Sequence, residues 1–71
     1  MVVIGIFGSE ELEELAIRLI GADSTQVYEE KVSPHKNLLS MRVQDMNEAL
    51  HIGRLLSDAG AEQVEIDAEA A

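Results

Sequence analysis

The chain has 71 residues, no cysteine, and a formal net charge of −9 from 14 acidic and 5 basic side chains. A chain this short forms one domain. Without cysteine it has no disulfide framework, thiol nucleophile or thiolate metal site, which fits a cytoplasmic protein. The acidic balance repels phosphodiester backbones and anionic lipid surfaces, so neither nucleic acid nor a membrane is an expected partner. Three explanations of the acidity stay open: it keeps the domain in solution, it attracts a basic partner, or it is an adaptation to a salt-rich cytoplasm.

The first segments predict a strand followed by a helix. Val2–Phe7 is continuously apolar, as in a central strand covered on both faces. Ser9 is a good N-cap for a helix over Glu10–Ile20, and Gly21 is suited to end it. Apolar residues recur at helical spacing and form one face of this helix: Leu12, Leu15, Ala16 and Leu19.

The middle of the chain predicts two strands around a turn. Residues 24–32 alternate but carry polar side chains on both faces, which is typical of an edge strand. Residues 33–37 contain Pro34 and read as a turn. Residues 38–44 alternate again and form the third strand, with Leu39, Met41 and Val43 on one face.

The last third repeats the pattern of a capped helix and a strand. Asp45 and Glu48 fit a capping box. The helix that follows has an expected buried stripe of Ala49, Leu50, Ile52, Gly53 and Leu56, and Gly60 is suited to end it. Gln63–Asp67 alternates and predicts the final strand, and residues 68–71 are an expected frayed tail.

The order β-α-β-β-α-β predicts an α+β fold, the ferredoxin-like βαββαβ sandwich, over a single domain at residues 1–67. Its four-stranded antiparallel sheet carries two helices on one face. Val2–Phe7 and residues 38–44 are the expected central strands, because they are the most apolar.

No constellation of side chains points to catalysis, and we expect no enzyme, no cofactor and no metal site. His35 lies in the turn, and His51 lies on the polar face of the second helix, without a nucleophile or second ligand at suitable spacing. The glycines at positions 5 and 8 lack the pattern of a phosphate loop. Phe7 and Tyr28 are the only aromatic residues, too few for an RNA-binding sheet.

An uncovered sheet face predicts an interface. Two helices cover only one face, so one apolar set of the first strand is left bare. We expect that set to be Val3, Gly5 and Phe7, joined by Ser40 and Arg42 of the third strand. The predicted partner is a second copy, giving a homodimer, or another protein. A monomer whose patch is shielded by polar side chains is the rival hypothesis.

The chain resembles small bacterial general-stress or heat-induced stress proteins in three segments: VVIGIFGSEE at 2–11, LLSMRV at 38–43 and LLSDAGAEQVE at 55–65. That resemblance implies no catalytic residues, and the chain lacks the family's glycine-rich stretch before the third strand. The order of the predicted strands and helices also resembles that of the amino-acid-binding ACT domain, although Gly8, Ser9 and Glu10 depart from the usual sequence of its first loop. The leading hypothesis is therefore a non-enzymatic module for protein interaction or self-association. The alternative is a regulatory module of ACT-like type that binds a small molecule.

Overall fold

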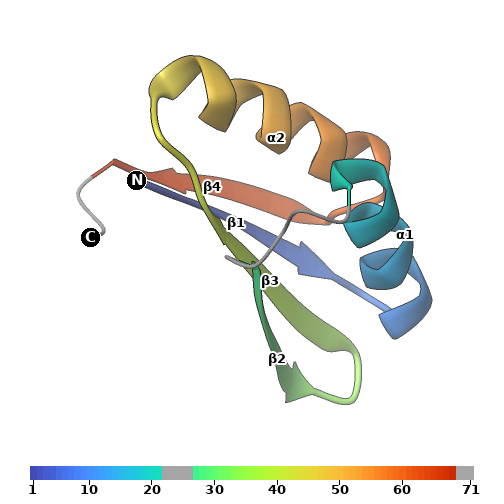
Figure 1. Cartoon of the computed structure of the whole chain (residues 1–71). Coiled ribbons are helices and arrows are strands. Elements are labelled where there is room, and N and C mark those ends of the chain that lie inside the picture. The colour runs from blue at the N-terminus through green and yellow to red at the C-terminus, as the bar shows by residue number, and fades with distance from the viewer. Residues whose placement is uncertain (22–26, 69–71) are drawn as a thin grey trace.

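The computed structural model describes residues 1–21 and 27–68 (Figure 1). Six elements follow in chain order: β1 (Val2–Phe7), α1 (Glu10–Ile20), β2 (Val27–Ser33), β3 (Lys36–Arg42), α2 (Met46–Asp58) and β4 (Gln63–Asp67). The predicted strand residues 24–26 and the tail residues 69–71 lie outside the described part.

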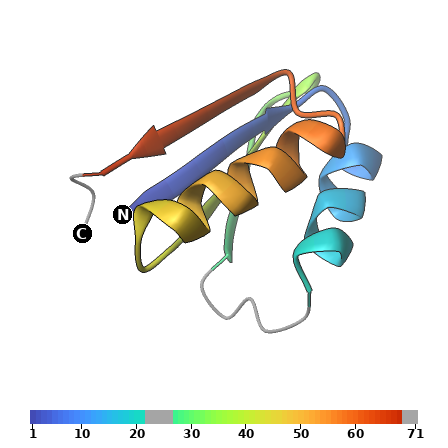
Figure 2. The same cartoon turned by 90° about the horizontal axis from the view of Figure 1, so that it is seen from above.

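The strands form one four-stranded antiparallel sheet in the order β2-β3-β1-β4. The fold is therefore α+β, and the prediction that the first and third strands are central is confirmed. Both helices lie on the same face of the sheet, as Figure 2 shows. Helix α2 packs over β1 and β4, while α1 packs over β1 and β3. The opposite face carries no helix among the described residues.

The boundaries of β1, α1 and β4 match the sequence prediction, whereas β3 begins at Lys36 and ends at Arg42, two residues earlier at each end than the predicted 38–44. The reason is the length of the turn. Ser33 pairs with Lys36, so Pro34 and His35 alone connect β2 to β3. The pairing of β2 with β3 also shifts between Lys31 and Ser33.

Both predicted N-caps are confirmed. The Ser9 hydroxyl accepts a hydrogen bond from the Leu12 N–H at 3.3 Å, and Asp45 Oδ1 accepts one from the Glu48 N–H at 2.8 Å. The Glu48 carboxylate accepts from the Gln44 N–H at 3.4 Å, one residue before the cap. These bonds satisfy backbone donors that have no partner within the helix.

Replacing Asp45 by Ala is expected to lower the free energy of unfolding by about 1 kcal/mol, because the Glu48 N–H loses its acceptor. Asp45→Asn is the matched control, since its side-chain oxygen still accepts that bond, and it is expected to retain most of the stability. Urea denaturation of both variants measures the difference. An Asp45→Ala variant as stable as the wild type would show that the cap contributes nothing.

Helix α2 ends in a Schellman motif. Gly60 takes a φ of 105°, a conformation that glycine adopts without steric cost. Its N–H donates to the Ser57 carbonyl, and the Ala61 N–H donates to the Leu56 carbonyl at 3.0 Å. The predicted role of Gly60 is confirmed, and the motif turns the chain directly into β4.

The core lies between the sheet and the two helices. The largest fully buried side chains are Phe7, Leu39, Leu56 and Val3. Gly5 lets α2 approach β1 closely, because a Cβ there would come within 3.1 Å of Leu56 Cδ1. The complete buried apolar set is Val3, Phe7, Ala16, Leu39, Val43, Ala49, Ile52, Leu56 and Ala59.

Helix α1 buries a different side from its predicted apolar face. Ala16 and Glu13 are buried, and Ile17 and Ile20 pack partly against the core. The remaining members of the predicted face are exposed: Leu12 by 37%, Leu15 by 43% and Leu19 by 50%. The apolar residues of α1 cover a wider arc than the sheet can bury, so part of the arc faces solvent.

The predicted buried stripe of α2 is correct except for Leu50. Ala49, Ile52, Gly53 and Leu56 are buried at the spacing i, i+3, i+4 and i+7. Leu50 is 58% exposed, because consecutive helical residues point about 100° apart and Ala49 holds the inward position.

Candidate functional site

The structure corrects three of the five predicted interface residues. Val3, Gly5 and Phe7 are buried beneath the helices, on the face that α2 covers, and no partner can reach them. Ser40 and Arg42 lie on the opposite face. The predicted alternation of β1 is confirmed, but the set predicted to be bare is the one that the helices cover.

The open face of the sheet, defined as the face without helices, has an apolar strip at its centre. Val2, Ile4 and Ile6 of β1 are half-buried there, and Leu38 of β3 pairs with Ile6. Tyr28 of the outer strand β2 is 58% exposed. The strip therefore runs along the middle of the sheet and has an aromatic side chain at one margin.

Charged side chains flank this strip in an ordered way. On β3 the exposed charges are basic, Lys36 and Arg42, whereas on β4 they are acidic, Glu65 and Asp67. Glu30 adds an exposed acid on β2. Because β1 lies between β3 and β4, the apolar strip separates a basic strand from an acidic one.

A second feature lies on the helix side, where Glu13 is buried in α1. Its side chain is only 6% exposed, and its Oε2 atom has no hydrogen-bond partner among the described residues. Burial and, to a lesser extent, the negative charges of Glu29, Glu10 and Glu14 together raise the pKa of Glu13 from 4.5 to about 7. A carboxyl with this pKa is about half protonated at neutral pH.

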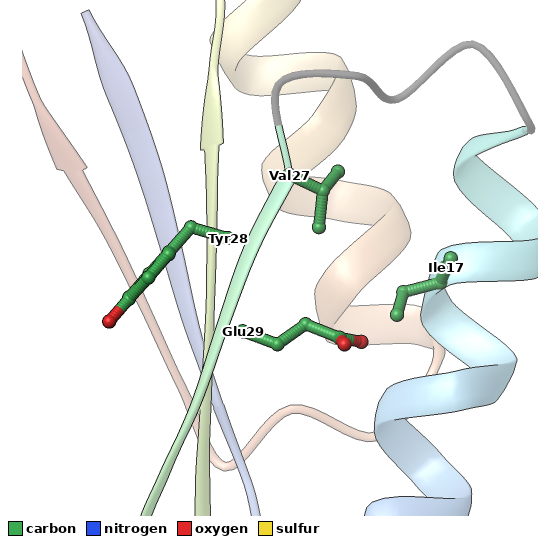
Figure 3. Close-up of a pocket in the computed structure, with 4 residues that line it drawn as sticks. All are labelled: Ile17, Val27, Tyr28 and Glu29. Atoms are coloured by element: carbon green, nitrogen blue, oxygen red, sulfur yellow. The ribbon is translucent and has the colours of Figure 1, made fainter.

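A groove lies between α1 and the outer strand β2. It has a volume of about 360 Å³ and is lined by Ile17, Val27, Tyr28 and Glu29. Figure 3 shows the Val27 and Glu29 side chains pointing toward Ile17, while the Tyr28 ring points to the other side of the sheet. The groove exists because α1 packs over β1 and β3 and does not reach β2 among the described residues.

The burial of Glu13 was not predicted from the sequence, although the spacing of its apolar neighbours on the helix indicates it. Ala16, Ile17 and Ile20 lie three, four and seven positions after Glu13, so the four residues share one helical face. A lone acid inside an otherwise apolar arc indicates either a partnered charge or a protonated carboxyl.

Within residues 1–21 and 27–68, no group of three or more His, Cys, Asp and Glu side chains is placed to hold a metal ion. His35 is exposed in the turn, and His51 is exposed on α2 beside Leu50 and Arg54. In the same part of the chain, every helix is too short or too polar to cross a membrane.

Comparison with family models, with curated proteins and with solved structures gave no match. The resemblance to small bacterial stress proteins therefore stays a prediction. The functional argument depends on the two surfaces described above.

Proposed function

We propose that this chain is a non-enzymatic module of the ferredoxin-like type that self-associates through the open face of its sheet. The observation that carries the proposal is the half-buried apolar strip of Val2, Ile4 and Ile6, which no element covers among the described residues. Such strips on small soluble domains mark interaction sites more often than chance exposure. A domain of this size also gains stability from the area that association buries.

The charges beside the strip favour a second copy as the partner. In a face-to-face pair with its twofold axis along β1, β3 of one copy lies over β4 of the other. Because Arg42 and Asp67 both pair with Val2, Arg42 of one copy then lies over Asp67 of the other, and Glu65 lies two residues further along that strand, within reach of the long Arg42 side chain. The same contact occurs twice, as a twofold interface requires. The apolar strips of the two β1 strands meet at the centre.

Replacing Ile4 by Glu is expected to convert the dimer to a monomer, because it places a charge in the middle of the apolar strip. Sedimentation velocity at micromolar concentration measures the mass. Leu50→Glu is the matched control, since Leu50 is exposed on α2 and away from the open face. Circular dichroism confirms that each variant remains folded. A monomeric wild-type chain, or a dimer that survives Ile4→Glu, would contradict self-association through this face.

A charge exchange tests the proposed orientation. Glu65→Arg and Arg42→Glu alone are each expected to weaken the dimer several-fold, and the double variant is expected to restore it. General repulsion between acidic chains makes the opposite prediction for Glu65→Arg, because this variant reduces the net charge of −9 in magnitude. A tighter dimer with Glu65→Arg would therefore eliminate the proposed pairing of β3 with β4.

A further inference from the structure

Helix α1 leaves three leucines exposed along one of its sides. Leu12, Leu15 and Leu19 follow at the spacing i, i+3 and i+7, which places them in a single stripe on the helix. Three of the seven large hydrophobic side chains that are exposed in the described part of the chain lie in this stripe. Single exposed leucines are ordinary, whereas a contiguous apolar patch marks an interaction site. We refer to these three residues as the leucine stripe.

The contact of Leu12 with the end of α2 shows where the stripe lies. A Cβ on Gly60 would come within 3.3 Å of Leu12 Cδ2, and Gly60 ends α2. The leucine stripe therefore lies on the side of α1 that is turned toward α2. Among the described residues α1 packs on β1, β3 and α2, and these three elements leave the stripe exposed.

Rotation of α1 about its own axis would not bury the leucine stripe without exposing other apolar residues. Ala16 and Ile20 each follow a leucine of the stripe by one position, which is about 100° around the helix. Both pack toward the core, and a rotation that brings the leucines inward would turn them outward. The leucine stripe is therefore buried only when a second molecule covers it.

The exposed charges around the leucine stripe are mainly acidic. Glu11 and Glu14 are exposed on α1, and Arg18 is the basic residue of that helix. The Glu62 carboxylate adds a third acid at the N-terminal end of α1, because it lies against Gly8 just before the helix. A second copy of the chain would bring the same excess of acid, whereas a basic partner has the complementary charge.

We propose that the leucine stripe binds a basic amphipathic helix of another protein. Apolar residues of that helix, spaced by three and four positions, pack on Leu12, Leu15 and Leu19, and its lysines and arginines reach Glu11 and Glu14. Docking of an amphipathic helix through residues at this spacing is a common mode of peptide recognition. The site does not depend on the proposed dimer, which uses the opposite face of the sheet.

The test uses a capped peptide of leucine and lysine, with its leucines on one helical face, as the probe. In an NMR titration of the wild-type chain, the methyl groups of the leucine stripe are expected to shift in a saturable way. Leu15→Gln is expected to raise the dissociation constant about tenfold, because a polar side chain replaces the central leucine without loss of helix propensity.

Leu50→Gln is the matched control and is expected to change the dissociation constant little. Leu50 is also an exposed helical leucine, at 58%. It lies three positions before Gly53, on the side of α2 where Gly53 faces Val64 of β4, and so away from α1. Circular dichroism confirms that both variants remain folded.

A second pair of variants tests the charge of the partner. Glu11→Gln is expected to weaken binding of the peptide several-fold, and added salt is expected to weaken it in the wild type. Glu30→Gln removes the same formal charge from an exposed position on β2, on the other face of the sheet, and is expected to have little effect.

Three results would overturn the proposal. The first is equal binding of a peptide with the same composition in scrambled order, which would show that charge alone drives association. The second is an equal loss in Leu50→Gln, or shifts centred on Ile4, which would place the peptide on another surface. The third is a wild-type mass that falls in Leu15→Gln without peptide, which would make a second copy the occupant of the stripe.

Discussion

Glu13→Gln is expected to remove most of the decrease in stability that the wild-type chain shows as the pH rises from about 4.5 to about 7. The pKa of Glu13 is raised from 4.5 to about 7 by burial and by the neighbouring acids Glu29, Glu10 and Glu14. Between these values the folded chain holds a proton that the unfolded chain has released. Stability therefore falls with pH across this window and levels off above it.

The size of this effect follows from the same shift, which corresponds to roughly 3 kcal/mol between the two ends of the window. Glu13→Gln keeps the shape of the protonated side chain and does not ionise. At a pH of about 8 this variant is therefore expected to be more stable than the wild type by up to that amount.

Glu14→Gln is the matched control for this prediction. It removes the same formal charge from the same helix, but Glu14 is exposed. General repulsion among the acidic side chains affects both variants alike, and burial affects only Glu13. Urea denaturation from pH 4.5 to 8 measures all three chains. Parallel stability profiles for the two variants would refute a special role for Glu13.

Phe7→Ala is expected to lower the free energy of unfolding by about 3–5 kcal/mol, because it leaves a cavity in the core. Phe7 is completely buried between β1 and the helices. For a domain with a total stability on the order of 5 kcal/mol, that loss approaches global unfolding. The midpoint of thermal unfolding, followed by circular dichroism, measures the effect.

Tyr28→Ala is the natural comparison, since Tyr28 is the only other aromatic residue and is 58% exposed. Its replacement is expected to change stability much less than that of Phe7. A similar loss in both variants would contradict the exposed position of Tyr28.

The order of the elements and the ends of the two helices were predictable, because they depend on local signals, whereas the bounds of β3 were not. Ser9 and Asp45 cap the helices where their side chains and the following acids suggested, and Gly60 ends α2 as expected. The central position of β1 and β3 followed from their apolar runs, since a strand with neighbours on both sides is seldom charged.

The choice between the two faces of β1 was not predictable in the same way. Val2, Ile4 and Ile6 are as apolar as Val3 and Phe7, so alternation alone does not say which set meets the helices. The decision depends on contacts distant in sequence, such as Leu56 of α2 fitting over Gly5. The same holds for α1, in which Glu13 faces inward and Leu19 faces solvent because of how the helix rests on the sheet.

The exposed edges of the outer strands β2 and β4 affect how molecules can assemble. An exposed strand edge can add further strands and grow into a fibre, and charged residues prevent this. Here β2 exposes Glu29 and Glu30, and β4 exposes Glu65 and Asp67. At neutral pH, edges of neighbouring molecules repel one another on both sides of the sheet. These charges oppose growth by strand addition, and the dimer proposed above uses the open face and not these edges.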